Sequence, residues 1–172
     1  MSYNNQFTSQ GMRCVQQVSL LRLWEQLRGK SKLPEFDALV PGDISRSIDK
    51  LSFSEVVHGE EGPRFRIIQN GTQFERIYPV SRVGRFLDET LPLAIREHAL
   101  HYYKLVVVGH QPSFSFSVLQ RCDGHLIRYE RLLLPFACKG TEVERIVAVI
   151  TLFSEDNGFD ASDVATGKLV EQ

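Results

Sequence analysis

Charged residues interrupt the most strand-like stretch of the chain, residues 128–135, which reads RYERLLLP. Side chains alternate along a strand, so Arg128 and Glu130 share one face while Tyr129 and Arg131 share the other. A charge that is buried alone is costly and must be paired. Two interpretations follow: an Arg–Glu ladder across neighbouring strands, or an arginine whose fork of donors orients an anionic ligand.

Hydroxyl and thiol nucleophiles are not expected to be reactive. Ser113, Ser115 and Ser117 alternate with phenylalanines, which predicts that the serines line the solvent side of a half-buried strand and that the phenylalanines point inward. The three cysteines are Cys14, Cys122 and Cys138. They are odd in number and widely spaced, which fits neither a disulfide framework nor a zinc pattern, so we expect inert thiols in a reducing cytoplasm.

The patterns that surround these residues predict an α+β domain. Helical spacing of apolar residues predicts a helix over residues 15–28 and a longer one over 92–108, with short helices near 43–50, 72–78 and 85–91. Strands are predicted at 51–57, 64–68, 112–119, 128–135 and 144–153. This order predicts five antiparallel strands with helices on one face and an added N-terminal helix.

The chain divides into four parts. We expect a flexible N-terminus over residues 1–13, a helical segment over 14–32, a core over 33–153, and a polar tail over 154–172 that is mobile or lies on the surface. The apolar stripe that includes Trp24 allows two alternatives: packing on its own domain, or pairing with a second copy.

Composition limits the class of partner. The 172 residues carry a formal net charge of −1, so no global field would draw the chain to nucleic acid or to an anionic membrane. No window reaches the roughly 18 consecutive apolar residues that a membrane helix needs. We therefore expect a cytoplasmic protein.

Several short stretches together resemble PAS domains, and specifically the small single-domain PAS-like proteins of bacteria, the PAS_5 family. The matching stretches are LWEQLR at 23–28, PRFR at 63–66, NGT at 70–72, GRFLDE at 84–89 and RYERLLLP at 128–135. The resemblance covers roughly residues 20–153, and the last stretch is its most specific part. It implies a five-stranded antiparallel sheet with a helical pocket on its inner face.

The resemblance implies a non-enzymatic sensory module that binds a small ligand or docks a signalling protein, with the signal leaving by protein contact. Aromatic and aliphatic residues would line the pocket, with Arg66 or Arg128 as its polar anchor, which suits a largely apolar ligand with one polar head. The ligand-binding candidates are Phe65, Arg66, Ile67, Phe74, Tyr78, Tyr102, Phe114, Arg128 and Glu130.

No cofactor is expected, although haem and flavin are left open. Haem-binding PAS domains take an axial imidazole from the long helix, which here carries His98 and His101; we expect surface or hydrogen-bonded histidines. The same pair at i, i+3 lacks a third metal ligand nearby. Flavin-binding light sensors have a reactive cysteine where this chain has Gly84.

Two other functions remain as alternatives. One is a small α+β enzyme of the ketosteroid-isomerase-like kind, which also combines a curved sheet, a long helix and a buried acid. That fold begins with long helices, whereas here a hairpin precedes the short helices. The other is a pure protein-interaction module whose phenylalanines fill its pocket. We also expect a homodimer through the N-terminal helix.

Overall fold

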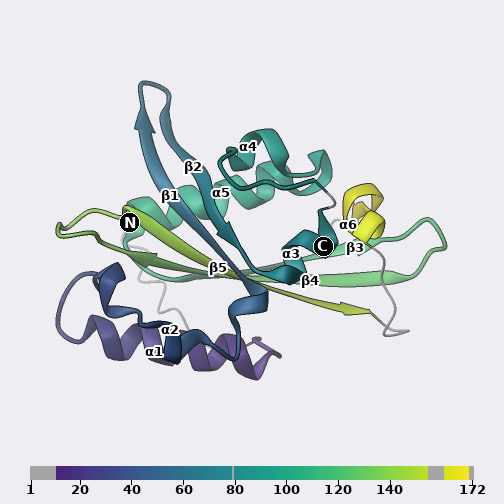
Figure 1. The fold of residues 1–172 in the computed structure, drawn as a ribbon. Helices are drawn as coiled ribbons and strands as arrows, with labels where there is room; N and C mark the ends of the chain where they lie inside the picture. The colour runs from purple at the N-terminus through teal and green to yellow at the C-terminus, as the bar shows by residue number, and fades with distance from the viewer. Residues whose placement is uncertain (1–10, 79, 155–160, 171–172) are drawn as a thin grey trace, which may run out of the picture.

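The structure is a computed structural model that describes residues 11–78, 80–154 and 161–170. The described helices are α1 Val15–Arg28, α2 Pro41–Ile44, α3 Thr72–Ile77, α4 Leu87–Thr90, α5 Leu93–Gly109 and α6 Ala161–Thr166. The strands are β1 Leu51–Gly59, β2 Gly62–Asn70, β3 Ser113–Gln120, β4 Leu126–Phe136, β5 Arg145–Ser154 and β6 Lys168–Val170. All strand pairs are antiparallel, in the order β2-β1-β5-β4-β3-β6 (Figure 1).

The predicted α+β architecture is confirmed, with six strands instead of five. The sixth strand comes from the predicted polar tail: β6 pairs with the outer edge of β3, and α6 buries Val164 completely. The tail was expected to be mobile or to lie on the surface. Residues 168–170 are exposed and pair with β3, whereas Val164 of α6 packs in the core. Of the N-terminus that was predicted to be flexible, residues 1–13, the first ten lie outside the described part of the chain.

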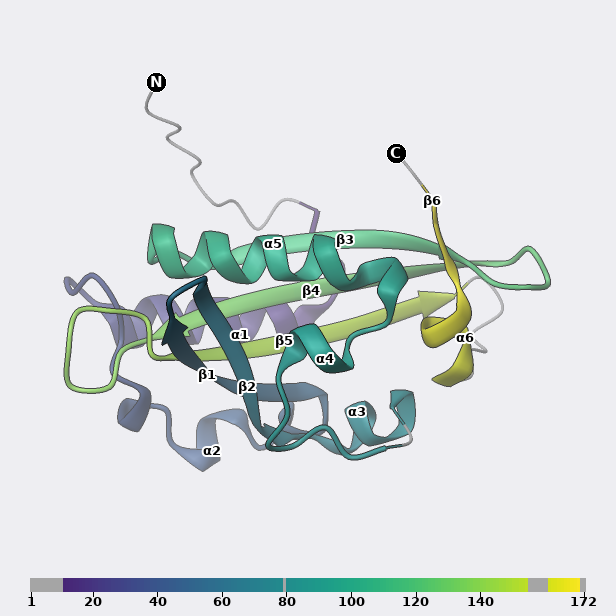
Figure 2. The same cartoon turned by 90° about the horizontal axis from the view of Figure 1, so that it is seen from above.

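The sheet separates two layers of helices (Figures 1 and 2). α3, α4 and α5 gather on one face, here called the inner face, and α1 and α2 lie on the opposite, outer face. Strand register assigns side chains to each face, because direct cross-strand neighbours point the same way. Across β1, β5, β4 and β3 the inner face carries Ser54, Ile146, Ala148, Leu133, Ile150, Arg131, Tyr129, Ser115 and Ser117.

The N-terminal helix packs on its own sheet. Leu20, Leu21 and Trp24 of α1 are at most 5% exposed, and the indole Nε1 of Trp24 donates to the carbonyl oxygen of Pro135 at 2.6 Å. The apolar stripe is therefore used within the domain, which was the first of the two alternatives. The predicted homodimer stays a prediction, and it would need a different side of α1.

The phase of β3 is opposite to the one predicted. Ser115 and Ser117 are each 5% exposed, because their register with Arg131 and Tyr129 turns them toward α5. The phenylalanines of β3 point to the outer face, where the guanidinium of Arg128 lies 3.8 Å from the centre of the Phe116 ring. The alternation of serines and phenylalanines was predicted correctly. Which of the two residue types faces solvent depends on which face of the sheet the long helix covers.

Candidate functional site

Five large polar side chains converge beneath the helices of the inner face. Tyr129 and Arg131 come from β4, Tyr103 comes from α5, and Tyr78 and Arg82 come from the segment that follows α3. Their exposed fractions are 1%, 2%, 4%, 8% and 5% in that order. We call these five residues the inner cluster. Burial of so much polar surface is unusual unless the polar atoms find partners.

The two arginines of the inner cluster contact aromatic rings but no carboxylate. The Arg82 guanidinium lies 3.8 Å from the centre of the Tyr78 ring, and the Arg131 guanidinium lies 5.0 Å from that of Tyr129. Within the described part of the chain, neither side chain makes an ion pair or a hydrogen bond, and Arg82 Nε and Arg131 Nη2 are buried without a partner. Aromatic faces compensate a buried cation only in part.

The hydroxyl groups around these cations are also unsatisfied. Tyr78 OH lies near Tyr129 OH, and Ser54 Oγ lies near Tyr103, but Tyr78 OH, Tyr129 OH and Ser54 Oγ make no hydrogen bond of good geometry among the described residues. Burial raises the pKa of Tyr103 to about 12, and the positive charges of Arg131 and Arg82 oppose that rise.

Burial likewise raises the pKa of Tyr78, Tyr129 adds to the rise, and Arg82 and Arg131 oppose it. Both cations therefore act electrostatically on both tyrosines. The hydroxyls stay protonated at neutral pH and can donate hydrogen bonds.

His98 lies at the border of the inner cluster. Its Nδ1 is 3.2 Å from Ser117 Oγ, so the two share a hydrogen bond. Burial lowers the pKa of His98, and the charges of Arg131 and His101 lower it further. The expectation of a hydrogen-bonded histidine is confirmed for His98, and His101 is exposed, as expected of a surface histidine. Within the described residues, no group of three His, Cys, Asp or Glu side chains could hold a metal ion.

The structure distributes the nine predicted ligand-binding residues over several places. Phe65, Ile67, Phe74 and Tyr78 are buried in the core, and the Phe65 ring packs against Tyr103 at 4.9 Å between centroids. Phe114, Arg128 and Glu130 lie on the outer face. Tyr102 meets Phe114 at the edge of β3, in a groove of about 450 Å³. Arg66 is exposed on β2.

The predicted arginine anchors are both paired with acids. Arg128 Nε donates to Glu130 Oε1 along the same strand, and this glutamate is fully buried. Arg66 pairs with Glu55 of β1, and Arg145 of β5 lies 3.6 Å from the same carboxylate. The Arg–Glu ladder is therefore what the structure shows for Arg66. Neither anchor reaches the inner cluster.

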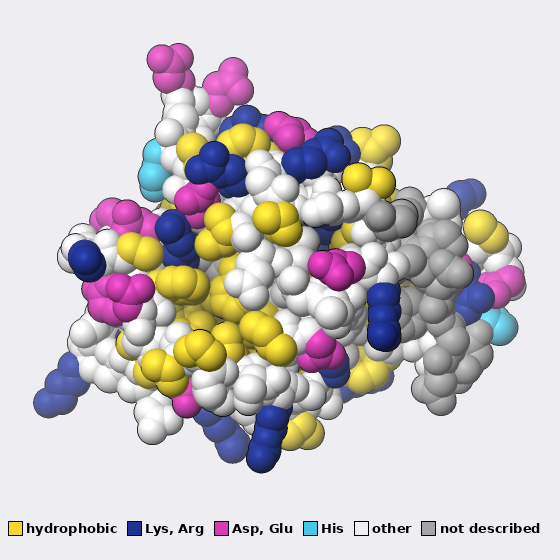
Figure 3. Space-filling model, viewed as in Figure 1, with side chains coloured by type: hydrophobic (Ala, Val, Ile, Leu, Met, Phe, Trp, Pro, Cys, Tyr) yellow, Lys and Arg dark blue, Asp and Glu magenta, His cyan; other side chains and the backbone are white. Residues whose placement is uncertain are grey.

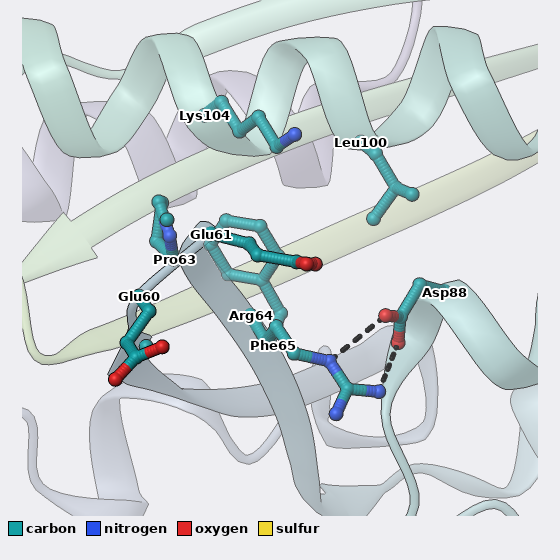
Figure 4. A pocket seen from close by; sticks show the side chains of 10 residues that line it. Glu60, Glu61, Pro63, Arg64, Phe65, Asp88, Leu100 and Lys104 are labelled. Carbon is teal, nitrogen blue, oxygen red and sulfur yellow. Dashed lines mark hydrogen bonds and ion pairs between the residues drawn. The ribbon is translucent and has the colours of Figure 1, made fainter.

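A second hollow lies between the β1–β2 hairpin and α5 (Figure 4). It has a volume of about 560 Å³, and Phe65 lines it together with Leu100 and Lys104 of α5. Its arginine is neutralised, because Arg64 forms a two-pronged ion pair with Asp88 and also contacts Glu89 at 2.8 Å. These contacts satisfy Arg64, so this arginine does not call for an anionic ligand.

Four residues of the inner cluster were absent from the predicted site: Arg82, Tyr103, Tyr129 and Arg131. Alternation along β4 predicted that Tyr129 and Arg131 share one face of the sheet. It could not predict which face the helices cover. Arg82 lies in an irregular segment, where no periodic pattern could have indicated burial.

The chain matches no model of a known protein family, and no curated protein matches it. It is similar in fold to a light-oxygen-voltage domain studied with a flavin analogue, at a TM-score of 0.47 and 13% identity over 67% of this chain and 84% of that one. It is also similar to a PAS domain from Colwellia psychrerythraea, at a TM-score of 0.46 and 14% identity over 66% of this chain and 97% of that one. An RNA-binding light-oxygen-voltage receptor matches at a TM-score of 0.45 and 16% identity, over 73% of this chain and 34% of that one. Similarity at this level tells nothing about the ligand of this chain.

Proposed function

We propose that this chain is a non-enzymatic, PAS-like sensory module that binds a small ligand between the inner face of its sheet and the helices α3 to α5. One observation carries the proposal. The guanidinium groups of Arg82 and Arg131 are buried, and neither makes an ion pair or a hydrogen bond within the described residues. Buried polar groups in folded proteins are nearly always paired, so a bound molecule is the natural partner for two buried guanidinium groups.

An enzyme is the weaker alternative. The contact between Ser117 and His98 is the arrangement that a nucleophile and its base would have. However, burial and the positive charge of Arg131 lower the pKa of His98, which disfavours the imidazolium that such a base must form. No carboxylate contacts His98 within the described residues to orient its ring.

Signal transfer by protein contact remains part of the proposal. The described residues include no helix that is long and apolar enough to cross a membrane. On the face shown in Figure 3, acidic and basic side chains are interspersed and hydrophobic side chains gather near the centre. A surface of mixed charge suits a protein partner better than a polyanion.

Native mass spectrometry of the full chain, purified from its own host, tests the proposal. We expect a co-purifying small molecule that is retained by the protein. The variant Tyr129→Phe should retain less of it, because one donor is removed, whereas Tyr102→Phe at the edge of β3 should retain as much as wild type. If the spectrum shows only the mass of the polypeptide, under conditions that preserve known complexes, the result would favour a protein-interaction module without a ligand.

A further inference from the structure

The ligand of the inner cluster can be assigned to a chemical class, an inference that rests on the proposed function. We propose that it is a small oxyanion with two negative charges, held between the guanidinium groups of Arg82 and Arg131. The argument begins with the distribution of arginine partners. Arg64, Arg66 and Arg128 are more exposed than these two, and each of them contacts a carboxylate.

The two most deeply buried arginines, in contrast, contact no acid among the described residues. Arg131 is 2% exposed and Arg82 is 5% exposed, and no ion pair or hydrogen bond reaches either side chain from the described residues. An arginine side chain keeps its positive charge in proteins, so burial leaves this cost in place. Two like charges in one interior also repel each other. A bound anion removes both penalties together.

The other polar atoms of the site are donors as well. The hydroxyls of Tyr78 and Tyr129 are buried beside each other, and each can donate to an oxyanion. Ser115, 5% exposed, faces the same space because it is the direct cross-strand neighbour of Arg131. Among the described residues no carboxylate contacts Arg82 or Arg131, so this donor set selects an anion and rejects a cation.

The number of cations indicates the charge of the ligand. Two guanidinium forks match two negative charges, which a phosphate group or a small dicarboxylate supplies equally well. The arginines come from different parts of the fold, since Arg131 is fixed in β4 whereas Arg82 lies in the irregular segment between α3 and α4. A ligand that binds both joins this segment to the sheet, which would make the segment responsive to the ligand.

Thermal unfolding of the full chain distinguishes the two sources of the anion. Inorganic phosphate and malonate are titrated separately, with sodium chloride at equal ionic strength as the control. We expect the midpoint to rise by several degrees with one of the two, because a ligand that binds the folded state stabilises it. The arm that shows the rise tells whether the ligand is of the phosphate or the dicarboxylate type.

Two substitutions make the result specific. Arg131→Met and Arg82→Met should abolish the anion-dependent rise, while the midpoint without ligand stays equal or increases, because an uncompensated charge is removed. Arg64→Met removes the same charge at the surface and should keep the rise. A rise that persists in Arg131→Met would overturn the inference, as would a loss of stability in that variant without ligand, which would give Arg131 a structural role.

Failure of the inference can be separated from failure of the proposed function. A neutral molecule that co-purifies with the protein, together with no response to either anion, would overturn the oxyanion and leave a ligand-binding module. No co-purifying molecule and no response to either anion would overturn both.

Discussion

At the residue scale, the meaning of an arginine in this protein depends on whether an acid accompanies it. Arg128 occupies a half-buried position on the outer face, and the buried Glu130 neutralises it. Arg131, three residues along the same strand, is more deeply buried and has no such partner. Because buried charge is costly, the unpaired arginine is the one that indicates binding, and the paired one indicates stability.

His98 should make the protein sensitive to acid. Its pKa in the folded state is lowered, first by burial and then by Arg131 and His101, so the unfolded chain binds the proton more tightly. As pH falls through the ordinary histidine pKa of about 6.5, protonation then favours the unfolded chain and stability decreases. Above that pH the effect is absent.

Urea unfolding between about pH 7.5 and pH 5.5 measures this effect. His98→Gln should lose part of the decrease in unfolding free energy that wild type shows on acidification. His58→Gln, which alters an exposed histidine in β1, should behave like wild type. An acid dependence in His98→Gln equal to that of wild type would contradict the assignment.

At the element scale, α1 is a structural part of the domain. It covers the outer face of the sheet through Leu20, Leu21 and Trp24 and forms a hydrogen bond to the backbone of β4. A helix of 14 residues would be marginal alone in water, so its stability comes from this packing. Removal of α1 should therefore expose the apolar outer face of the sheet.

Substitution of Trp24 tests that role. Trp24→Ala should lower the free energy of unfolding by about 3–5 kcal/mol, because it leaves a large cavity in the core. Trp24→Phe keeps a ring but leaves the Pro135 carbonyl without its donor, at a cost on the order of 1 kcal/mol beyond the lost volume. Val15→Ala, at a position that is 78% exposed, should change stability by less than about 0.5 kcal/mol. Chemical denaturation provides the values, and equal effects at Trp24 and Val15 would show that α1 is not docked.

At the scale of the whole molecule, the sheet divides two tasks. The inner face holds Arg82 and Arg131 without an acid partner beneath α3 to α5, and the outer face holds paired charges and the N-terminal helix. A second copy of the chain would have to bind to the side of α1 that faces away from the sheet. Val15, Ser19 and Leu23 follow one another at helical spacing and border a groove of about 610 Å³ between α1 and the segment at residues 42–47.

The homodimer remains a prediction, with this side of α1 as its contact. Sedimentation velocity over a range of concentrations should show a dimer for wild type, and the double variant Val15→Ser, Leu23→Ser should shift it toward monomer. Val108→Ser alters an equally exposed valine on α5, at 79%, and should not change the sedimentation. A monomer for wild type at every concentration would contradict the prediction.

Local patterns in the sequence determined the element order and the α+β class, because apolar periodicity and turn residues act over a few positions. The same patterns identified the alternation of β3 and β4, which placed Tyr129 and Arg131 together. Tertiary structure alone decided which face of the sheet lies under α5, and with it the burial of Ser115 and Ser117. It also brought Arg82, from a segment without periodicity, over the buried ring of Tyr78. Burial and the lack of a partner depend on contacts between residues far apart in the chain, so the inner cluster emerged only when the chain was folded.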